Sequence, residues 1–552
     1  MARRALRGMS RRRRSIIAGT VAGAVAMSGV AVSVLSNGSA ALSQANGGSP
    51  RWRPCKGLMT PPGSANESQS GSSAGMTRSP GPGAPTGPQN IQSIRLECAT
   101  LKVPVDYAHP EGGQLDVAIS RLSAPGSKPR EPLLINPGGP GGSGLVMPLV
   151  VMALGGQKLL ARYDLIGFDP RGLGRSTRVS CGLTAEQKSA LPPWPTGGSI
   201  SANISTARQI AEQCQRTSPR LMPHITTSNT ARDMDRIRIA LGQKRIAYLG
   251  YSYGTYLGAV YDALFPAHLD RAVLDSVVSP KRIWRGSVLA WGPAVEKRFP
   301  DFTSWLASKH STYGLGTTSK QVRGRYFTLI TQLTRSPLRV PTRATPTGRI
   351  DGHYFAEFTL TQIDMDQSFP FLAQFWRDVY LRDETAATEM IERVKNTAIP
   401  QPAAGGIDTM LGVFCNDAPW PRSPKVYEDG VRQDEAAYPL AGGMAANIWP
   451  CAFWPRKWVQ HPVPIRQTGQ AKILLVENER DPATPYRGAV DMRAALGDRA
   501  HLVTVEGGGH IGFLIRNSPC LRKTVFAFLV QRLTLTRNLR CAARPATDGK
   551  GV

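Results

Sequence analysis

A serine near the middle of the chain has the local sequence of a nucleophile. Ser252 is the centre of Gly250-Tyr251-Ser252-Tyr253-Gly254, which follows an apolar run at residues 246–249 and leads into a helical pattern from Thr255. A turn from strand into helix is too tight for side chains at the two glycine positions. It also exposes the serine oxygen at a helix N-terminus, where backbone N–H groups stabilise negative charge. In a chain with 56 glycines the pentapeptide alone could equally be a structural turn, so its interpretation depends on partner residues.

An acid and a base follow in the order that this chemistry requires. Asp481 comes after a predicted buried strand at residues 472–477, and His510 comes after a predicted strand at residues 501–506 and three glycines. A serine hydroxyl is a poor nucleophile until an imidazole takes its proton, and the imidazole needs a carboxylate to fix its tautomer. Alone, Asp481 could be a turn cap and His510 a surface residue. Three such residues in this order, each after a strand, predict a triad for acyl transfer.

A glycine-rich loop could supply the oxyanion hole. Residues 137–144, Pro-Gly-Gly-Pro-Gly-Gly-Ser-Gly, follow the predicted strand 132–136. The backbone N–H of Gly139 is the predicted donor from this loop, and the N–H of Tyr253 is the predicted second donor. A flexible linker or a phosphate loop is the alternative, but no lysine follows the glycines as a phosphate loop requires.

Taken together, these segments resemble the proline iminopeptidase branch of the α/β-hydrolases, and within it the secreted tripeptidyl aminopeptidases of actinobacteria. The matching segments are Asn136-Pro137-Gly138-Gly139-Pro140-Gly141, Asp169-Pro170-Arg171-Gly172, Ser252-Tyr253-Gly254-Thr255-Tyr256, Leu274-Asp275, Asp481-Pro482-Ala483-Thr484-Pro485 and Gly509-His510. The likeness extends over roughly residues 50–545. It implies that Ser252, Asp481 and His510 are nucleophile, acid and base. Tyr251, where relatives often have a second glycine, and the segment 477–480 depart from the pattern and could reshape the substrate entrance.

The eight cysteines include no C-x-x-C and no Cys/His cluster at ligand spacing, so we expect neither a metal site nor a cofactor. Pairing is the expected fate of cysteines in an exported chain, and free buried thiols are the alternative. Sequence alone does not choose among the possible connectivities. The resemblance implies pairs of sequence neighbours: Cys55 with Cys98, Cys181 with Cys214, Cys415 with Cys451, and Cys520 with Cys541.

The N-terminal region predicts export. The first 14 residues contain seven arginines and no acid, and residues 15–35 are uncharged. We interpret residues 1–45 as a cleaved signal peptide, with an uncleaved membrane anchor and a twin-arginine export route as alternatives. Residues 46–90 are rich in Gly, Ser and Pro and are predicted to be a disordered linker or pro-segment, although Trp52 and Cys55 could be attached to the folded body.

The remaining residues exceed the needs of one α/β-hydrolase sheet. The predicted strand 271–275 and the acid-bearing strand from Lys472 are both core elements, and the long segment between them has helical and aromatic patterns. We therefore expect an α/β-hydrolase fold with a core formed by residues 91–280 and 471–552. Residues 281–470 are predicted to be a mostly helical cap over the active site, which would control substrate entry.

The net charge of +28 includes seven arginines of the predicted signal, and no nucleic-acid-binding motif accompanies it. Arginines spread along the chain explain the charge, and the more specific alternative is electrostatic association with an anionic cell envelope. The oligomeric state is left open by the sequence.

The sequence predicts a secreted serine exopeptidase that releases short peptides, tripeptides by the resemblance, from substrates with a free N-terminus. A secreted esterase or amidase acting on small molecules is the alternative, because the same triad cleaves esters. A noncatalytic envelope-binding protein on the same scaffold is a third hypothesis. A free-amine requirement predicts carboxylates on the cap side of the pocket. Asp417 is one candidate, with a structural capping role as its alternative, and other substrate-binding residues are not identified.

Overall fold

The computed structural model describes residues 49–55, 57–58, 95–124, 130–195, 199–342, 345, 347–397, 405–515 and 518–542. All of them belong to the unit Ser49–Val552. The predicted signal peptide and most of the predicted linker lie outside the described residues, so the predictions made for them stay predictions.

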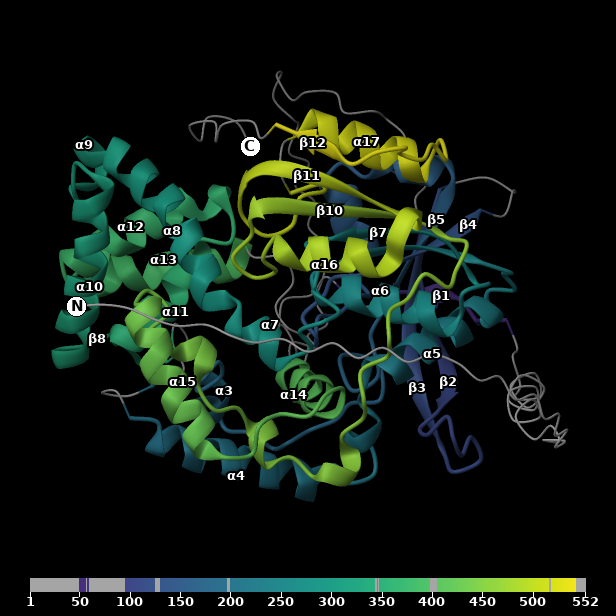
Figure 1. Cartoon of the computed structure of the whole chain (residues 1–552), viewed down its shortest axis with the longest axis horizontal. Helices are drawn as coiled ribbons and strands as arrows, with labels where there is room; N and C mark the ends of the chain where they lie inside the picture. The colour runs from purple at the N-terminus through teal and green to yellow at the C-terminus, as the bar shows by residue number, and fades with distance from the viewer. Residues whose placement is uncertain are drawn as a thin grey trace, which may run out of the picture. The chain divides into compact units, whose positions relative to one another are not determined.

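A ten-stranded sheet forms the core of the described chain (Figure 1). Its spatial order is β1 (Arg53–Pro54), β2 (Arg95–Pro104), β3 (Gln114–Ser123), β5 (Tyr163–Phe168), β4 (Glu131–Asn136), β6 (Ile246–Tyr251), β7 (Leu269–Asp275), β10 (Lys472–Arg480), β11 (Ala500–Gly508) and β12 (Leu539–Cys541). The pairs from β1 to β5 are antiparallel, and those from β5 to β12 are parallel. In the parallel part, the carboxyl ends of β6, β7, β10 and β11 therefore lie at one edge of the sheet.

Helices cover both faces of this sheet, because the central strands are apolar on both sides. Leu134, Leu274 and Leu475 belong to a buried cluster with residues of α5 (Thr227–Ala240), α6 (Tyr253–Leu264) and α16 (Arg487–Leu496). Their strand neighbours Leu133 and Leu474 belong to a second cluster, with residues of α2 (Met147–Ala153) and α17 (Pro519–Leu529). Helices α16 and α17 lie on opposite sides of β10 and β11 (Figure 1). This arrangement confirms the predicted α/β class.

The segment between β7 and β10 is mostly helical, as predicted for a cap. It contains α7 (Arg285–Leu289), α8 (Trp291–Ser308), α9 (His310–Tyr313), α10 (Ser319–Arg335), α11 (Gly352–Gln362), α12 (Phe369–Tyr380), α13 (Glu384–Thr397), α14 (Gly406–Asn416), α15 (Pro424–Ala437) and the paired strands β8 (Leu338–Arg339) and β9 (Arg349–Ile350). Aromatic side chains from α8, α10, α11 and α12 form a separate buried core, which includes Phe302, Tyr326, Phe355 and Trp376. The cap therefore has its own hydrophobic core.

Two helices pack against a different part of the protein from the one that their position in the sequence predicts. Helix α4 (Ser201–Thr217), which follows α3 (Ala185–Ser189) and precedes the nucleophile strand, shares a buried cluster with Tyr427 and Val431 of α15. Conversely, Phe414 of α14 packs into the cluster on the face of the core sheet. In space, α4 from the predicted first core segment therefore packs with the cap, whereas α14 from the predicted cap packs on the core.

Short 3₁₀ helices complete the secondary structure at η2 (Gln157–Ala161), η3 (Met222–His224), η4 (Asp366–Ser368), η5 (Met444–Ala446), η6 (Pro450–Phe453), η7 (Arg456–Trp458) and η8 (Gly497–Arg499). None of the helices in the described ranges is long and apolar enough to cross a membrane.

The structure contains the four disulfides that the resemblance implies: Cys55–Cys98, Cys181–Cys214, Cys415–Cys451 and Cys520–Cys541. The first fastens β1 to β2, and the guanidinium of Arg121 lies 4.3 Å from the ring centroid of Trp52 beside it. Both aromatic and sulfur contacts thus attach residues 52–55 to the folded body, as expected. Four disulfides are typical of proteins that fold outside a reducing cytoplasm.

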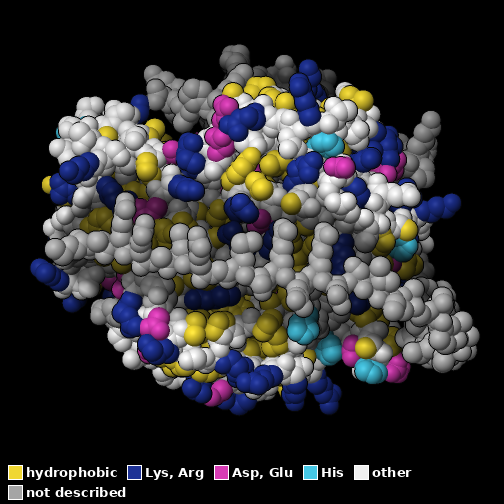
Figure 2. Space-filling model, viewed as in Figure 1, with side chains coloured by type: hydrophobic (Ala, Val, Ile, Leu, Met, Phe, Trp, Pro, Cys, Tyr) yellow, Lys and Arg dark blue, Asp and Glu magenta, His cyan; other side chains and the backbone are white. Residues whose placement is uncertain are grey.

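Charged side chains are spread over the visible face. Figure 2 shows Lys and Arg scattered across it and interspersed with Asp and Glu. This distribution on the visible face differs from the clustered basic surface typical of nucleic-acid-binding proteins.

Candidate active site

Ser252 lies at a sharp turn between β6 and α6. Its backbone has φ 54° and ψ −122°, a conformation that L-residues rarely adopt. A Cβ at Gly250 would lie 2.5 Å from the carbonyl oxygen of Gly254, and a Cβ at Gly254 would lie 2.8 Å from Oδ1 of Asn136. The two glycines of the pentapeptide are therefore required by close packing. This geometry is that of a nucleophile elbow, with Ser252 directly before the first residue of α6.

The glycine-rich loop after β4 packs directly on this turn. A Cβ at Gly138 would lie 2.5 Å from the carbonyl oxygen of Tyr251 and 2.9 Å from Cβ of Ser252, so only glycine fits there. Oδ1 of Asn136 accepts a hydrogen bond from the N–H of Gly138 at 3.0 Å. The next residue, Gly139, lines the same cavity as Ser252 and Tyr253. The predicted oxyanion donors therefore border one cavity with the predicted nucleophile.

Asp481 and His510 form a hydrogen-bonded pair. Nδ1 of His510 lies 2.8 Å from Oδ2 of Asp481 and 3.1 Å from its Oδ1. Asp481 is fully buried as a side chain, whereas the imidazole is 15% exposed. Strand β10 runs to Arg480, beyond the predicted end of the strand, and places Asp481 immediately after it. With Nδ1 engaged by a carboxylate, Nε2 is the nitrogen left for a serine hydroxyl.

Thr484 is a residue of this site that sequence reasoning missed. Its hydroxyl donates to Oδ2 of Asp481 at 3.0 Å, and its backbone N–H donates to Oδ1 at 2.8 Å. The backbone N–H of Ala483 also donates to Oδ1. The Asp-Pro-Ala-Thr-Pro segment was a signal for this role, because a carboxylate in a turn can accept N–H groups two and three residues on. These donors orient Asp481 toward His510.

Asp275, at the end of β7, connects the two halves of the site. Its carbonyl oxygen accepts the N–H of Ser252 at 2.9 Å. Its carboxylate accepts the N–H of Gly512 at 2.9 Å and of Phe513 at 2.6 Å, two and three residues after His510. The sequence showed Asp275 within a family motif, but only the fold shows what it contacts. One buried residue thus holds both the elbow and the histidine loop.

Burial and mutual charge set the protonation of the site. Burial alone would lower the pKa of His510, but the charge of Asp481 and the hydrogen bond to it outweigh this and raise the pKa to about 9. Burial alone would raise the pKa of Asp481, but His510 and the N–H of Thr484 lower it. Asp481 is therefore ionised, and His510 must lose its proton before it can act as a base.

The cap reaches the histidine loop through Asp364. Its carbonyl oxygen accepts the N–H of His510 at 2.6 Å. Burial raises the pKa of the Asp364 carboxyl to about 7, despite the nearby positive charge of His510. The cap and the core are therefore connected at the base itself.

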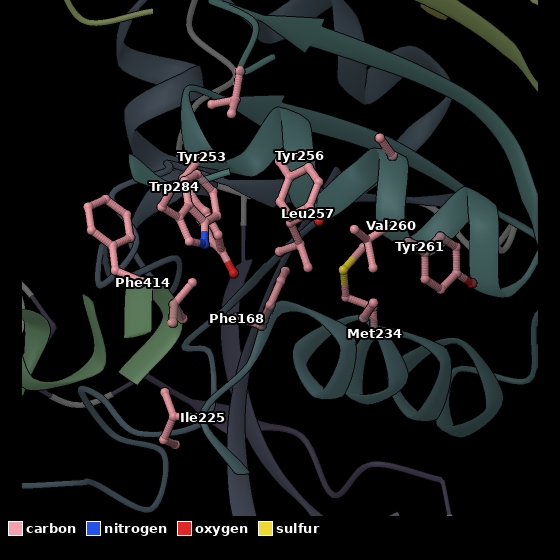
Figure 3. Close-up of a cluster of buried hydrophobic side chains, with 14 of the residues drawn as sticks. Phe168, Ile225, Met234, Tyr253, Tyr256, Leu257, Val260, Tyr261, Trp284 and Phe414 are labelled. Carbon is pink, nitrogen blue, oxygen red and sulfur yellow. The ribbon is translucent and has the colours of Figure 1, made fainter. Parts of the chain in front are cut away.

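A cavity of about 150 Å³ opens at Ser252. Its walls are largely apolar and come from the core, the start of the cap and the acid loop. Figure 3 shows two of these wall residues, Trp284 and Phe414, beside Tyr253 at the start of α6; the Trp284 and Phe414 rings are stacked with centroids 5.0 Å apart. The other apolar members of the wall include Val277, Val278, Val288, Ala290, Trp291, Ala483 and Pro485. The described lining includes the charged Arg282 and no carboxylate.

Asp417 is not among the described residues that line this cavity. Its buried carboxylate accepts hydrogen bonds from the N–H and hydroxyl of Thr227, at 2.9 and 2.5 Å, and from Nε1 of Trp284 at 3.2 Å. Burial raises its pKa to about 6. The structural alternative is therefore the one that these contacts favour, because Asp417 holds Trp284 in the cavity wall. The expected acidic lining is not found among the described residues of this cavity.

Comparison with known proteins identifies a matching family model and relatives with names of hydrolases. Residues 438–541 match the family model described as "TAP-like protein". The chain is 36% identical to the tripeptidyl aminopeptidase of Streptomyces coelicolor, over 81% of this chain and 83% of that protein. It is 28% identical to serine protease Hip1 of Mycobacterium tuberculosis, over 80% of this chain and 87% of that protein. It is also 31% identical to carboxylesterase B of Mycobacterium tuberculosis, over 85% of this chain and 94% of that protein.

The connecting role of Asp275 is testable by substitution. In Asp275→Asn one carboxylate oxygen is lost, so one of the two loop N–H groups keeps no acceptor, at a cost of about 1–3 kcal/mol. We expect kcat for a peptide amide to fall about tenfold to a hundredfold, because the base is displaced from the nucleophile. Asp270→Asn is the matched control at the other end of β7, where Asp270 pairs with Arg532. Equal kcat values for the two variants would contradict this role.

Proposed function

Because the chain belongs to the tripeptidyl aminopeptidase family of serine peptidases with the α/β-hydrolase fold, we propose that it is an exopeptidase that releases short peptides, in particular tripeptides, from free N-termini. The observation that carries this proposal is the elbow at Ser252 next to a buried Asp481–His510 pair, with Gly139, Ser252 and Thr484 lining one cavity. The residue types, their order in the chain and their positions at strand ends all support acyl transfer.

In the proposed mechanism, the Ser252 oxygen attacks the scissile carbonyl while Nε2 of His510 takes its proton. The positive imidazolium is stabilised by Asp481 through Nδ1. The backbone N–H groups of Tyr253 and Gly139 stabilise the negative oxygen of the tetrahedral intermediate. His510 then donates its proton to the leaving amine. His510 next takes a proton from the water that attacks the acyl-enzyme and returns it to the Ser252 oxygen as the acyl–oxygen bond breaks, which releases the N-terminal peptide with a free carboxylate.

The apolar cavity supports a preference for the side chain next to the scissile bond. Because Ser252 and Gly139 both line it, a carbonyl held for attack would place the adjoining side chain there. Trp284 and Phe414 offer apolar contact, and Arg282, whose side chain is 43% exposed and lies 3.8 Å from Asp491, is the charged residue of the described lining. We infer that a residue with an apolar side chain precedes the cleaved bond, and that an acyl group carrying a lysine or arginine side chain fits less well.

The aminopeptidase claim is tested with fluorogenic amides of one, two or three residues, with free and with acetylated N-termini. We expect the free tripeptide amide to be cleaved fastest and acetylation to abolish its cleavage. Ser252→Ala should lower kcat by about 10⁶-fold, the scale of nucleophile removal in serine peptidases.

Two outcomes would contradict the proposal in different ways. Equal cleavage of acetylated and free substrates would reject the exopeptidase and favour the esterase or amidase, an alternative supported by the relative named carboxylesterase B. Activity that survives Ser252→Ala would reject the nucleophile itself.

The cavity is tested by filling it. Ala290 lines the cavity and is partly exposed, so Ala290→Trp should fit without disrupting the core. We expect kcat/KM to fall about 10–100-fold for substrates with a bulky apolar residue before the cleaved bond, and to fall much less for alanine. The neighbouring residue Leu289 is 38% exposed and is not among the described residues that line the cavity, so Leu289→Trp is the matched control. Equal losses for both substrates would contradict this assignment.

We also propose that the protein is exported and acts outside the cytoplasm, with electrostatic association with the cell envelope. The four disulfides and the basic composition support this location; the net charge is +28 with the seven arginines of the predicted signal included. Washing intact cells with increasing salt should release the protein, because salt screens surface charges. Retention that does not change with salt would contradict electrostatic association.

A further inference from the structure

Three carboxyl groups of the core are buried together beside one imidazole, and the carboxyl of Asp364 from the cap also acts on it. Asp275 and Glu477 are fully buried, and Asp481 is 2% exposed. Asp275 ends β7, Glu477 lies within β10, and Asp481 directly follows β10. If all three were ionised, a single imidazolium would face three buried negative charges, which is costly. At least one of these groups must therefore hold a proton.

Asp481 is not the protonated member. It accepts hydrogen bonds from two backbone N–H groups, from the hydroxyl of Thr484 and from Nδ1 of His510. Four donors on one carboxyl favour its ionised form, since an ionised carboxylate only accepts. The negative charge of the site therefore belongs on Asp481.

Glu477 is hydrogen-bonded to Asp481, four residues further along the chain. Its Oε2 accepts the N–H of Val277 at 2.7 Å, and its Oε1 accepts the N–H of Asn478 at 3.2 Å. A hydrogen bond between two carboxyl groups requires a proton between them. Burial, reinforced by the charges of Asp481 and Asp275, raises the pKa of Glu477 well above its usual value. The proton between the two groups therefore belongs to Glu477.

We propose that Glu477, as a neutral acid, is a positioning residue of the active site, which donates a hydrogen bond to Asp481 and fixes that carboxylate against His510. This inference rests on the proposed function, because it assigns Asp481 the role of the orienting acid. A neutral donor holds Asp481 in place without a second negative charge beside the base. Segment 477–480, directly before Asp481, departs from the family pattern. The hydrogen bond between the two carboxyl groups also explains how a glutamate is tolerated at position 477.

The proposal predicts different activities for two substitutions of Glu477 that are similar in size. Glu477→Gln keeps a neutral hydrogen-bond donor of the same shape but loses one of the two oxygens that accept N–H groups, whereas Glu477→Met keeps the volume and removes the donor and both acceptors. Glu479→Gln is the matched control on the same strand, where Glu479 is paired with Arg540 at the surface. For hydrolysis of p-nitrophenyl acetate, we expect Glu477→Gln to lower kcat less than Glu477→Met does, by no more than about tenfold, because it keeps the donor and leaves only one N–H group without an acceptor. Glu477→Met should lower kcat about tenfold to a hundredfold with KM nearly unchanged, the loss expected for a hydrogen bond to a charged group.

Infrared difference spectroscopy tests the proton directly and needs no activity. Asp275 and Asp364, whose pKa values lie at about 7, contribute protonated-carboxyl bands of their own at neutral pH, so each variant is compared with wild type. The wild-type spectrum minus that of Glu477→Gln should contain the C=O stretch of a buried protonated carboxyl, and the same difference for Glu479→Gln should lack it. This measurement decides the question even if Glu477→Met does not fold.

The proposal is overturned if Glu477→Gln is as impaired as Glu477→Met, if Glu477→Met is as active as wild type, or if the wild-type spectrum minus that of Glu477→Gln lacks the band. Failure of the proposed function has a different signature, since activity would then survive Ser252→Ala while the infrared band still reports on Glu477.

Discussion

The end of strand β7 is the point on which the active-site geometry depends. Asp275 accepts the N–H of Ser252 with its carbonyl oxygen and the N–H groups of Gly512 and Phe513 with its carboxylate. Nucleophile and base come from strands far apart in the sequence, and their relative position must be accurate to well under 1 Å for acyl transfer. Parallel pairing of β6, β7 and β10 brings these loops to one edge, and Asp275 fixes their spacing.

The buried acids around the end of β7 differ in their pKa values. Asp481 is ionised and balances His510, while burial raises the pKa values of Asp275 and Asp364 to about 7. Burying one ion pair beside Glu477 in its neutral form costs far less than burying several charges. The histidine loop is also held from the cap, through the carbonyl oxygen of Asp364. The electrostatic environment of His510 therefore depends on groups from both the core and the cap.

The sequence predicted the parts of the site that local chemistry specifies. The glycines around Ser252 show the tight turn, and the acid and histidine each follow an apolar strand. The roles of Asp275 and Thr484 were missed because they depend on which groups the fold brings within hydrogen-bond distance. For the same reason, no local pattern predicted that α4 packs on α15 or that Asp417 holds Trp284. The disulfide pairs came from the family resemblance, and the structure contains the same pairs.

The central claim is that Ser252 is a nucleophile activated by His510. A fluorophosphonate forms a stable covalent adduct with an activated serine, so mass spectrometry of the labelled, digested protein tests the claim most directly. The account predicts one adduct, on the peptide that contains Ser252, and a large drop in its rate of formation in His510→Gln. An adduct on another serine, or labelling of Ser252 at the same rate in wild type and His510→Gln, would contradict it.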